Sequence, residues 1–188
     1  MSSPWLWFVS RAGGVVSLVL LTVVVVAGAV TAADRPLPTA MAGWVAGLHR
    51  YLTLGVLGLL TIHIGAAVID TYVDLAWSAV IVPFTGGYRP AGVGWGAVAI
   101  DALGLVALTS WLRPRLSRRG WHAMHWLAYV VAVAAVVHAV TMASADKPVF
   151  LVITLGCGAV MGLSTVWRVC STSPDRRRRA RVAAGEWT

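Results

Sequence analysis

Charged side chains are scarce in this chain, and acidic ones are the scarcest. Asp and Glu together number 7 in 188 residues, charged residues make up 12%, and hydrophobic residues make up 59%. A soluble domain of this size cannot bury that much apolar side chain, whereas a lipid bilayer can surround it. The composition therefore excludes an ordinary soluble enzyme and predicts an integral membrane protein.

Cysteine is also rare, and Cys157 and Cys170 are the two examples. Both fall in one predicted helix, where their spacing along the chain corresponds to about 20 Å. The Cα atoms of a disulfide lie within about 7 Å of each other. The two thiols therefore cannot bridge each other, and the sequence predicts neither a disulfide scaffold nor a zinc site.

Long apolar runs divide the chain into five segments, each near the roughly 20 residues that cross a bilayer. Polar breaks, most of them with proline, separate them. A further apolar stretch, Leu75–Pro83, is too short to span and is expected in the interface or against the bundle. We predict an all-α membrane bundle over residues 1–170 and a basic, disordered tail at 171–188. The predicted spans are Ala12–Ala33, Trp44–Ile69, Gly94–Leu112, Trp121–Ala143 and Pro148–Arg168.

The net charge of +8 comes mainly from arginines at the ends of these spans. This distribution indicates orientation in a membrane rather than binding of nucleic acid. The positive-inside rule then places the N-terminus outside and the C-terminus in the cytoplasm of a cell membrane. The outer side keeps Arg11, Arg89 and Lys147, and the cytoplasmic side holds Arg35, Arg50, Arg113, Arg115, Arg118, Arg119, Arg168, Arg176 to Arg179 and Arg181.

Both ends of the chain allow a second interpretation. The first span could be a cleaved signal peptide that ends at Thr31-Ala32-Ala33, but Trp5 and Trp7 stand where a signal peptide has basic residues. We expect the span to be retained. The Arg176–Arg179 run is expected to be a solvated topogenic tail, and it also has the charge to contact anionic lipid or a partner.

Four histidines form two matched pairs inside the second and fourth spans. His49 and His63 are 14 residues apart, and His125 and His138 are 13 apart. The two spans run in the same direction, so His49 and His125 share the inner level and His63 and His138 the outer level, about 20 Å away. Histidine is expensive inside a membrane and is usually functional there. The pattern predicts two hemes, each with its iron held by one imidazole from each helix.

The angular positions of the histidines agree with this prediction for one helix and not for the other. At about 100° per residue, a step of 14 residues returns to nearly the same helix face. A step of 13 lands about 140° away, so His125 and His138 do not share a face of an ideal helix. Either the two hemes lie on different sides of the fourth span, or that helix is locally irregular.

Other polar residues offer secondary roles. His122 is expected to be an interfacial or propionate-contacting residue rather than a ligand, although it could replace His125. Asp101 lies in the middle of the third span, where it could relay a proton, bind a quinone or simply hydrogen-bond to a neighbouring helix. Arg50, Arg89 and Arg113 lie near the two heme levels and could neutralise heme propionates, but terminal arginines are mainly topogenic.

The glycines of the second span also have two interpretations. Gly55, Gly58 and Gly65 flank the histidines, and they would let a flat macrocycle or another helix approach the backbone. Ordinary packing between transmembrane helices explains them equally well.

Several segments together resemble the ferric reductase-like transmembrane domain family. They are Leu48-His49-Arg50-Tyr51 through Ile62-His63, Val82-Pro83-Phe84 with Tyr88-Arg89-Pro90, Thr109-Ser110-Trp111-Leu112-Arg113, and Trp121-His122-Ala123-Met124-His125-Trp126-Leu127-Ala128-Tyr129 through His138. The resemblance extends over roughly Trp5–Val169. It implies two b-type hemes between the two histidine helices, and it favours His125 over His122 as a ligand.

The chain departs from the larger relatives because few residues follow the last span and no Gly-rich phosphate loop is present. We therefore expect electrons from a cytoplasmic flavin reductase or from membrane quinol, and an extracytoplasmic flavoprotein, metalloenzyme or ferric iron as acceptor. The predicted function is transmembrane electron transfer by a di-heme cytochrome b subunit of an oxidoreductase. The alternatives are a heme-free membrane anchor, and a proton or metal-ion transporter that uses the histidines and Asp101.

Overall fold

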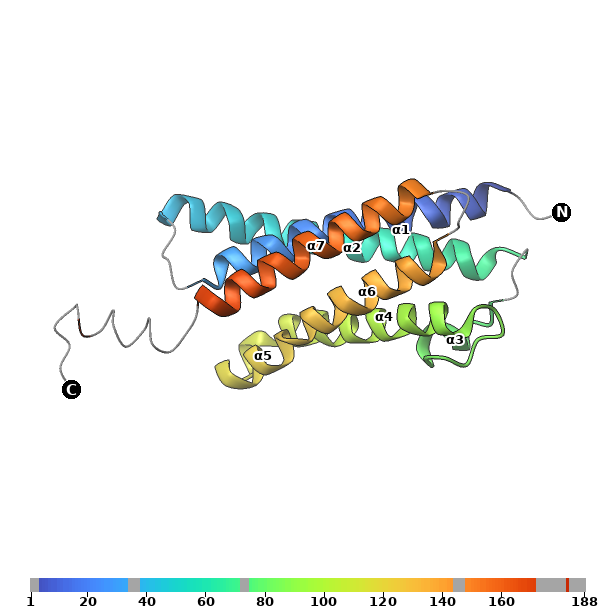
Figure 1. Ribbon diagram of the computed structural model, residues 1–188. Coiled ribbons are helices and arrows are strands. Elements are labelled where there is room, and N and C mark those ends of the chain that lie inside the picture. The colour runs from blue at the N-terminus through green and yellow to red at the C-terminus, as the bar shows by residue number, and fades with distance from the viewer. Residues whose placement is uncertain (1–3, 34–37, 72–74, 144–147, 172–181, 183–188) are drawn as a thin grey trace.

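In the computed structural model, the described part of the chain is helical and contains no strand. The structure describes residues 4–33, 38–71, 75–143, 148–171 and 182, so the predicted tail and the arginines within it lie almost wholly outside the described residues. Figure 1 shows the helices in one elongated bundle, with the start of α1 and the end of α7 at opposite ends of it. The elements are α1 (Pro4–Thr31), α2 (Thr39–Ile69), α3 (Ser78–Ile81), α4 (Pro90–Trp111), the 3-10 turn η1 (Arg113–Arg115), α5 (Arg118–His125), α6 (Leu127–Met142) and α7 (Pro148–Ser171).

Among the described residues, five helical segments are long and apolar enough to cross a membrane, in agreement with the predicted number of spans. Each predicted span matches one of them, although α1 begins at Pro4 instead of Ala12. Proline occupies the first turn of α1, α4 and α7, where its missing N–H has no intrahelical partner to lose. The predicted non-spanning stretch forms the short helix α3, which packs against α4.

The bundle is apolar on its outside as well as inside. On α7, for example, Val152 is 68% exposed and Leu163 is 71% exposed. An apolar surface over the full length of a helix is unfavourable in water, but it is compatible with the hydrocarbon of a bilayer. Together with the five spans, this surface makes the chain a multi-pass membrane protein.

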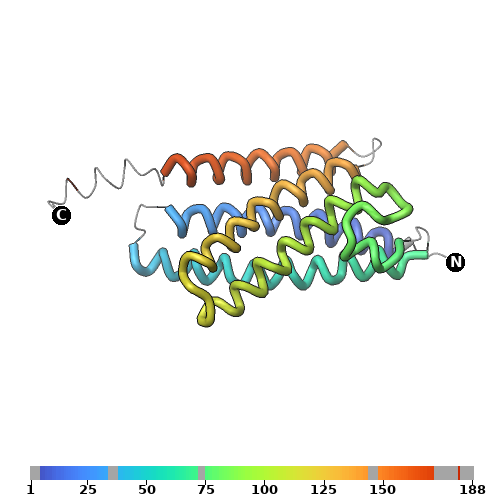
Figure 2. Tube along the Cα trace, turned by 90° about the horizontal axis from the view of Figure 1, so that it is seen from below, coloured from blue at the N-terminus to red at the C-terminus, as the bar shows by residue number. Residues whose placement is uncertain are grey.

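The spans form two packed pairs. Helix α1 packs along α2, helix α4 packs along α6, and α7 lies against both α1 and α6. Helices α2 and α6 run in the same direction, as Figures 1 and 2 show. We call the two ends of the bundle the α3 end and the α5 end, after the short helix that lies at each.

A layer of buried apolar side chains fills the middle of the bundle. Val56 of α2 is the most enclosed large member, and it lies halfway between His49 and His63 in the sequence. The layer places apolar side chains between the two ends of the bundle. Its other buried members are Leu18, Leu21, Val24, Val25, Ala102, Leu103, Val131, Ala132 and Met161.

The fourth span is interrupted at Trp126, directly after His125. There α5 ends and α6 begins. The Trp126 N–H contacts the carbonyls of both His122 and Ala123, and the Tyr129 N–H donates back to the Trp126 carbonyl at 3.1 Å. These contacts three residues apart tighten the helix locally. The fourth span therefore contains a local irregularity between His125 and His138.

Candidate functional site

The four histidines meet in two pairs, one toward each end of the bundle. His49 of α2 faces His125 at the end of α5, with 6.3 Å between the ring centroids and 59° between the ring planes. His63 of α2 faces His138 of α6, with 6.2 Å between the centroids and 79° between the planes. The structure thus brings together the pairs that the matched spacings predict.

The separation within each pair is suited to a metal ion between two imidazoles. A ligating nitrogen lies about 2.0–2.1 Å from the metal and about 1.1 Å from the centre of its own ring, so two opposed ligands place their ring centres about 6.2–6.4 Å apart. Both pairs agree with this range. In the described part of the chain no cluster of three or more His, Cys, Asp or Glu residues could hold a metal ion. Two imidazoles alone suit a metal whose remaining ligands come from a macrocycle.

Three of the four imidazoles are oriented by a backbone carbonyl on a neighbouring helix. The Nδ1 of His49 donates to the Val24 carbonyl at 2.9 Å, and the Nδ1 of His63 to the Ser10 carbonyl at 2.6 Å, both on α1. The Nδ1 of His138 donates to the carbonyl of Gly92 on α4 at 2.8 Å. A proton on Nδ1 leaves Nε2 as the free nitrogen for a metal, which is the usual arrangement of ligating histidines.

Each of these three carbonyls stands four residues before a helical glycine. Gly28 follows Val24, Gly14 follows Ser10, and Gly96 follows Gly92. A Cβ at Gly14 would lie 2.9 Å from Cε1 of His63, and one at Gly28 would lie 3.3 Å from Cε1 of His49. A Cβ at Gly96 would lie 2.8 Å from Nδ1 of His138.

These contacts explain why glycine is needed at the three positions. In an α-helix each carbonyl points toward the residue four positions later. The missing side chain of that residue therefore opens the space through which the imidazole reaches the carbonyl.

His125 is held differently. Its Nδ1 is buried and has no hydrogen-bond partner among the described residues. Its ring instead stacks on the indole of Trp121, one helical turn earlier, with 4.9 Å between centroids and 25° between planes. The guanidinium carbon of Arg113 lies 4.5 Å from the centre of the same indole ring. An aromatic side chain rather than the backbone thus positions this fourth imidazole.

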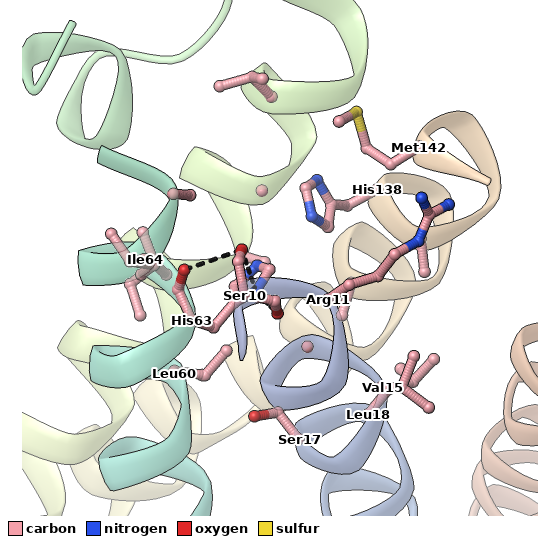
Figure 3. A pocket seen from close by; sticks show the side chains of 18 of the residues that line it. Ser10, Arg11, Val15, Ser17, Leu18, Leu60, His63, Ile64, His138 and Met142 are labelled. Carbon is pink, nitrogen blue, oxygen red and sulfur yellow. Dashed lines mark hydrogen bonds between the residues drawn. The ribbon is translucent and has the colours of Figure 1, made fainter. Parts of the chain in front are cut away.

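A cavity of about 410 Å³ lies at the His63–His138 pair, within the size range of cofactor sites. Its floor is the apolar layer around Val56, and its walls come from α1, α2, α4, α6 and α7. Figure 3 shows Ser10 hydrogen-bonded to His63 on one side, with His138, Arg11 and Met142 opposite. Arg11 and Arg89 are both among the lining residues, so two cationic side chains border a mainly apolar space.

The secondary candidates fall in different places. His122 is exposed and its Nδ1 donates to the Arg118 carbonyl of its own helix, so it is not placed against His49. Arg89 borders the cavity and donates to the Thr141 carbonyl at 3.4 Å. Arg50 is exposed on α2, directly after His49. Asp101 lies on the exposed face of α4, away from both pairs.

Sequence reasoning missed the glycines that matter. Cβ atoms at Gly58 and Gly65 would meet no protein atom within 4 Å, so no described helix packs closely against these two glycines. The glycines that lie against the imidazoles are on α1 and α4. A signal was present, because Gly14 and Gly28 on α1 have the same separation as His49 and His63 on antiparallel α2.

The fold and the paired imidazoles define a class: a multi-pass helical membrane protein with histidine pairs suited to a macrocyclic metal cofactor. The chain belongs to the family described as the ferric reductase like transmembrane component, which it matches over residues 13–136. That match covers α1 to α6 up to just before His138, and it is shorter than the resemblance predicted from the sequence. No curated protein and no solved structure matches the chain.

Membership in this family points to transmembrane electron transfer and, in general terms, to redox partners. The family commonly binds heme. The residues present fit that group in three respects: the paired imidazoles have the right separation, Nδ1 donates to a carbonyl in three of four cases, and glycines clear space beside the rings.

Proposed function

We propose that this protein is the di-heme cytochrome b subunit of a membrane oxidoreductase. One b-type heme would be held between His49 and His125 and the other between His63 and His138. The observation that carries the proposal is the equal separation of the two pairs, 6.3 and 6.2 Å between ring centroids, which suits one iron per pair.

A bound heme supplies a one-electron carrier, and two imidazoles per iron leave no coordination position for oxygen or substrate. This ligation suits a relay better than oxygen activation. The protein itself positions the imidazoles and surrounds them with apolar side chains. Backbone carbonyls fix the imidazoles of His49, His63 and His138, and the apolar layer around Val56 excludes water between the two levels.

The orientation and the partners are part of the proposal. At the α5 end the described arginines are Arg50, Arg113, Arg115, Arg118, Arg119 and Arg168, against Arg11 and Arg89 at the α3 end. The positive-inside rule then puts the α5 end in the cytoplasm of a cell membrane. A cytoplasmic flavin reductase is the donor we favour, ahead of membrane quinol. A flavoprotein, a metalloenzyme or ferric iron would accept electrons outside.

The absorption spectrum of the purified full-length protein tests the proposal directly. We expect the dithionite-reduced spectrum of a low-spin b-type cytochrome, two hemes per chain, and no change on adding carbon monoxide, because two histidines would already bind each iron. A colourless protein would leave the membrane-anchor and transporter alternatives. A carbon monoxide adduct would show that one imidazole does not bind iron.

The choice of donor is tested by stopped-flow reduction of the hemes. The arginine-rich α5 end would attract an acidic flavoprotein, and such steering weakens as salt screens the charges. We expect reduction by a flavin reductase with NADPH to slow as ionic strength rises, and no reduction by NADPH alone. Rapid reduction by a quinol analogue, independent of salt, would instead assign the donor to the membrane.

A further inference from the structure

Two stacked rings at the α5 end of the bundle each carry a buried nitrogen atom without a hydrogen-bond partner among the described residues. These atoms are Nε1 of Trp121 and Nδ1 of His125, and Ser17 Oγ is the one other buried side-chain atom of this kind among the described residues. An indole N–H can only donate, so Trp121 needs an acceptor. Burying such a donor unpaired is costly, which is why nearly all buried polar groups in proteins have a partner.

The local structure fixes the Trp121 side chain beside the imidazole of His125. Ser117 caps α5, and its Oγ accepts from the Gly120 N–H at 3.1 Å. Trp121 follows directly and stacks on His125 at 4.9 Å between ring centroids. The indole is therefore fixed one turn from an imidazole whose opposite partner is His49.

A permanent cation stands at the same indole. The guanidinium carbon of Arg113 lies 4.5 Å from the Trp121 ring centre. Arginine in this position gains from the electron-rich face of the ring, and it also brings positive charge to the rim of the His49–His125 site. A buried donor and a neighbouring cation together are suited to an anionic acceptor, above all a carboxylate.

We propose that Trp121 and Arg113 form the carboxylate-binding edge of the His49–His125 site. The indole N–H of Trp121 donates to a propionate of the heme at this pair, and Arg113 supplies the opposing charge. This inference rests on the proposed function, because a b-type heme is what brings a carboxylate to the site. It gives Trp121 a binding role, and it selects Arg113 among the arginines near the heme levels.

The test is Trp121→Phe in the full-length protein, with Trp126→Phe as the matched control. Phenylalanine keeps an aromatic ring beside His125 and removes the N–H. Trp126 is five residues further on, is 49% exposed and has Arg168 over its ring, so its variant makes the same chemical change away from the proposed edge. Both variants are made also with His63→Ala, which leaves the His49–His125 heme as the one measured.

The readouts are the midpoint potential, the heme affinity and the propionate bands in resonance Raman spectra. Without the N–H the propionate carries more uncompensated negative charge, which favours the ferric state. Trp121→Phe should therefore lower the midpoint potential of this heme and shift its propionate band. Affinity should fall roughly tenfold, as expected for a lost charge-assisted hydrogen bond. Trp126→Phe should change none of these.

Arg113→Gln gives an independent check that carries little folding risk, since this residue is exposed. It should lower the same potential, and Arg113→Lys should restore part of it. If the hemes are present and both Trp121→Phe and Arg113→Gln leave potential and propionate band unchanged, a water or nothing satisfies the indole and the inference is wrong, while the proposed function stands. A wild-type protein without heme would overturn the proposed function itself.

Discussion

The two histidine pairs have nearly the same separation, but the protein builds them in different ways. At the His63–His138 pair both imidazoles donate Nδ1–H to backbone carbonyls, and both lie against helical glycines. At the other pair, His49 likewise donates Nδ1–H to a backbone carbonyl. His125 instead stacks on the Trp121 ring, next to the break in the helix. Both imidazoles of one pair are thus held by backbone carbonyls, whereas in the other pair one imidazole is held by an aromatic side chain.

This difference has a physical consequence. An imidazole that donates Nδ1–H to a carbonyl is a better electron donor at its other nitrogen. The carbonyl-and-glycine arrangement also leaves no room for adjustment, because the imidazole fills the volume that a side chain would occupy. Stacking on an indole restricts the position of an imidazole less than this close packing does. We therefore expect the His63–His138 site to be more sensitive to packing changes, and the His49–His125 site to respond more to aromatic and charged neighbours.

The largest expected effect is the loss of one heme from a pair that loses a ligand. His63→Ala should reduce the heme content from two to one per chain by emptying the His63–His138 site, and His49→Ala should empty the other. The measurements are heme stoichiometry and the spectrum of the heme that remains. His122→Ala is the control, and it should keep both hemes because His122 bonds to its own helix. Two hemes retained in either ligand variant would contradict the pairing.

The glycine substitutions give the next effect and separate the two sites most directly. Gly96→Ala and Gly14→Ala introduce a Cβ within 3.0 Å of an imidazole atom, whereas Gly28→Ala introduces one at 3.3 Å. Overpacking of this kind typically costs about 1–3 kcal/mol. We expect the first two variants to weaken heme binding at the His63–His138 pair roughly tenfold or more, with a smaller change at the other pair from Gly28→Ala.

A matched glycine excludes a general effect on the helices. Gly58 is exposed on α2 and lies roughly 140–180° around the helix from His63 and His49, so Gly58→Ala should leave both hemes in place. Alanine also favours helix over glycine by about 1 kcal/mol, so a loss in the other variants cannot come from helix propensity. Equal heme affinities in Gly96→Ala and Gly58→Ala would show that the imidazole of His138 can move without penalty.

The sequence predicted the five spans and the four histidines because both signals are local. Twenty apolar residues identify a span wherever it packs, and a histidine inside such a run is conspicuous without a partner in view. The carbonyl partners could not be predicted in the same way. That Val24 accepts from His49 depends on how α1 lies against α2, which hydropathy does not encode. The equal separations of Gly14 and Gly28 and of the two α2 histidines were the available clue.

The fourth span shows where an ideal helix misleads. The 13-residue step between His125 and His138 predicted an angular mismatch, and the structure shows an interruption of the helix at Trp126, between these two residues. Nothing in the sequence marks this position, since no proline or glycine stands there. The sequence also did not predict on which face of α4 Asp101 lies. The third span is apolar around its whole circumference, so no pattern distinguished the exposed face of α4 from the packed one.

A smaller effect is expected on the midpoint potentials. Two carbonyl-bonded imidazoles stabilise ferric iron more than one does, so the His63–His138 heme should have the lower potential from this ligand contribution. A net hydrogen bond contributes about 1 kcal/mol, which corresponds to roughly 40 mV for a one-electron couple. Redox titration of the single-heme variants His49→Ala and His63→Ala measures each heme separately. The reverse order would mean that nearby charges outweigh the ligand hydrogen bonds.

The smallest effect is expected at Asp101, although an acid in the middle of a span invites a functional interpretation. Its side chain is on the exposed face of α4, while the histidine pairs lie on the packed side of the bundle. Asp101→Asn removes the charge with little change in shape. Both hemes and both potentials should stay as in the wild type, and the yield of folded protein should be equal or higher because a charged group in hydrocarbon is unfavourable. The decisive measurement is heme reduction by a quinol analogue, since a slower rate in Asp101→Asn with unchanged hemes would show that the carboxylate handles a proton or a quinone at the lipid-facing surface.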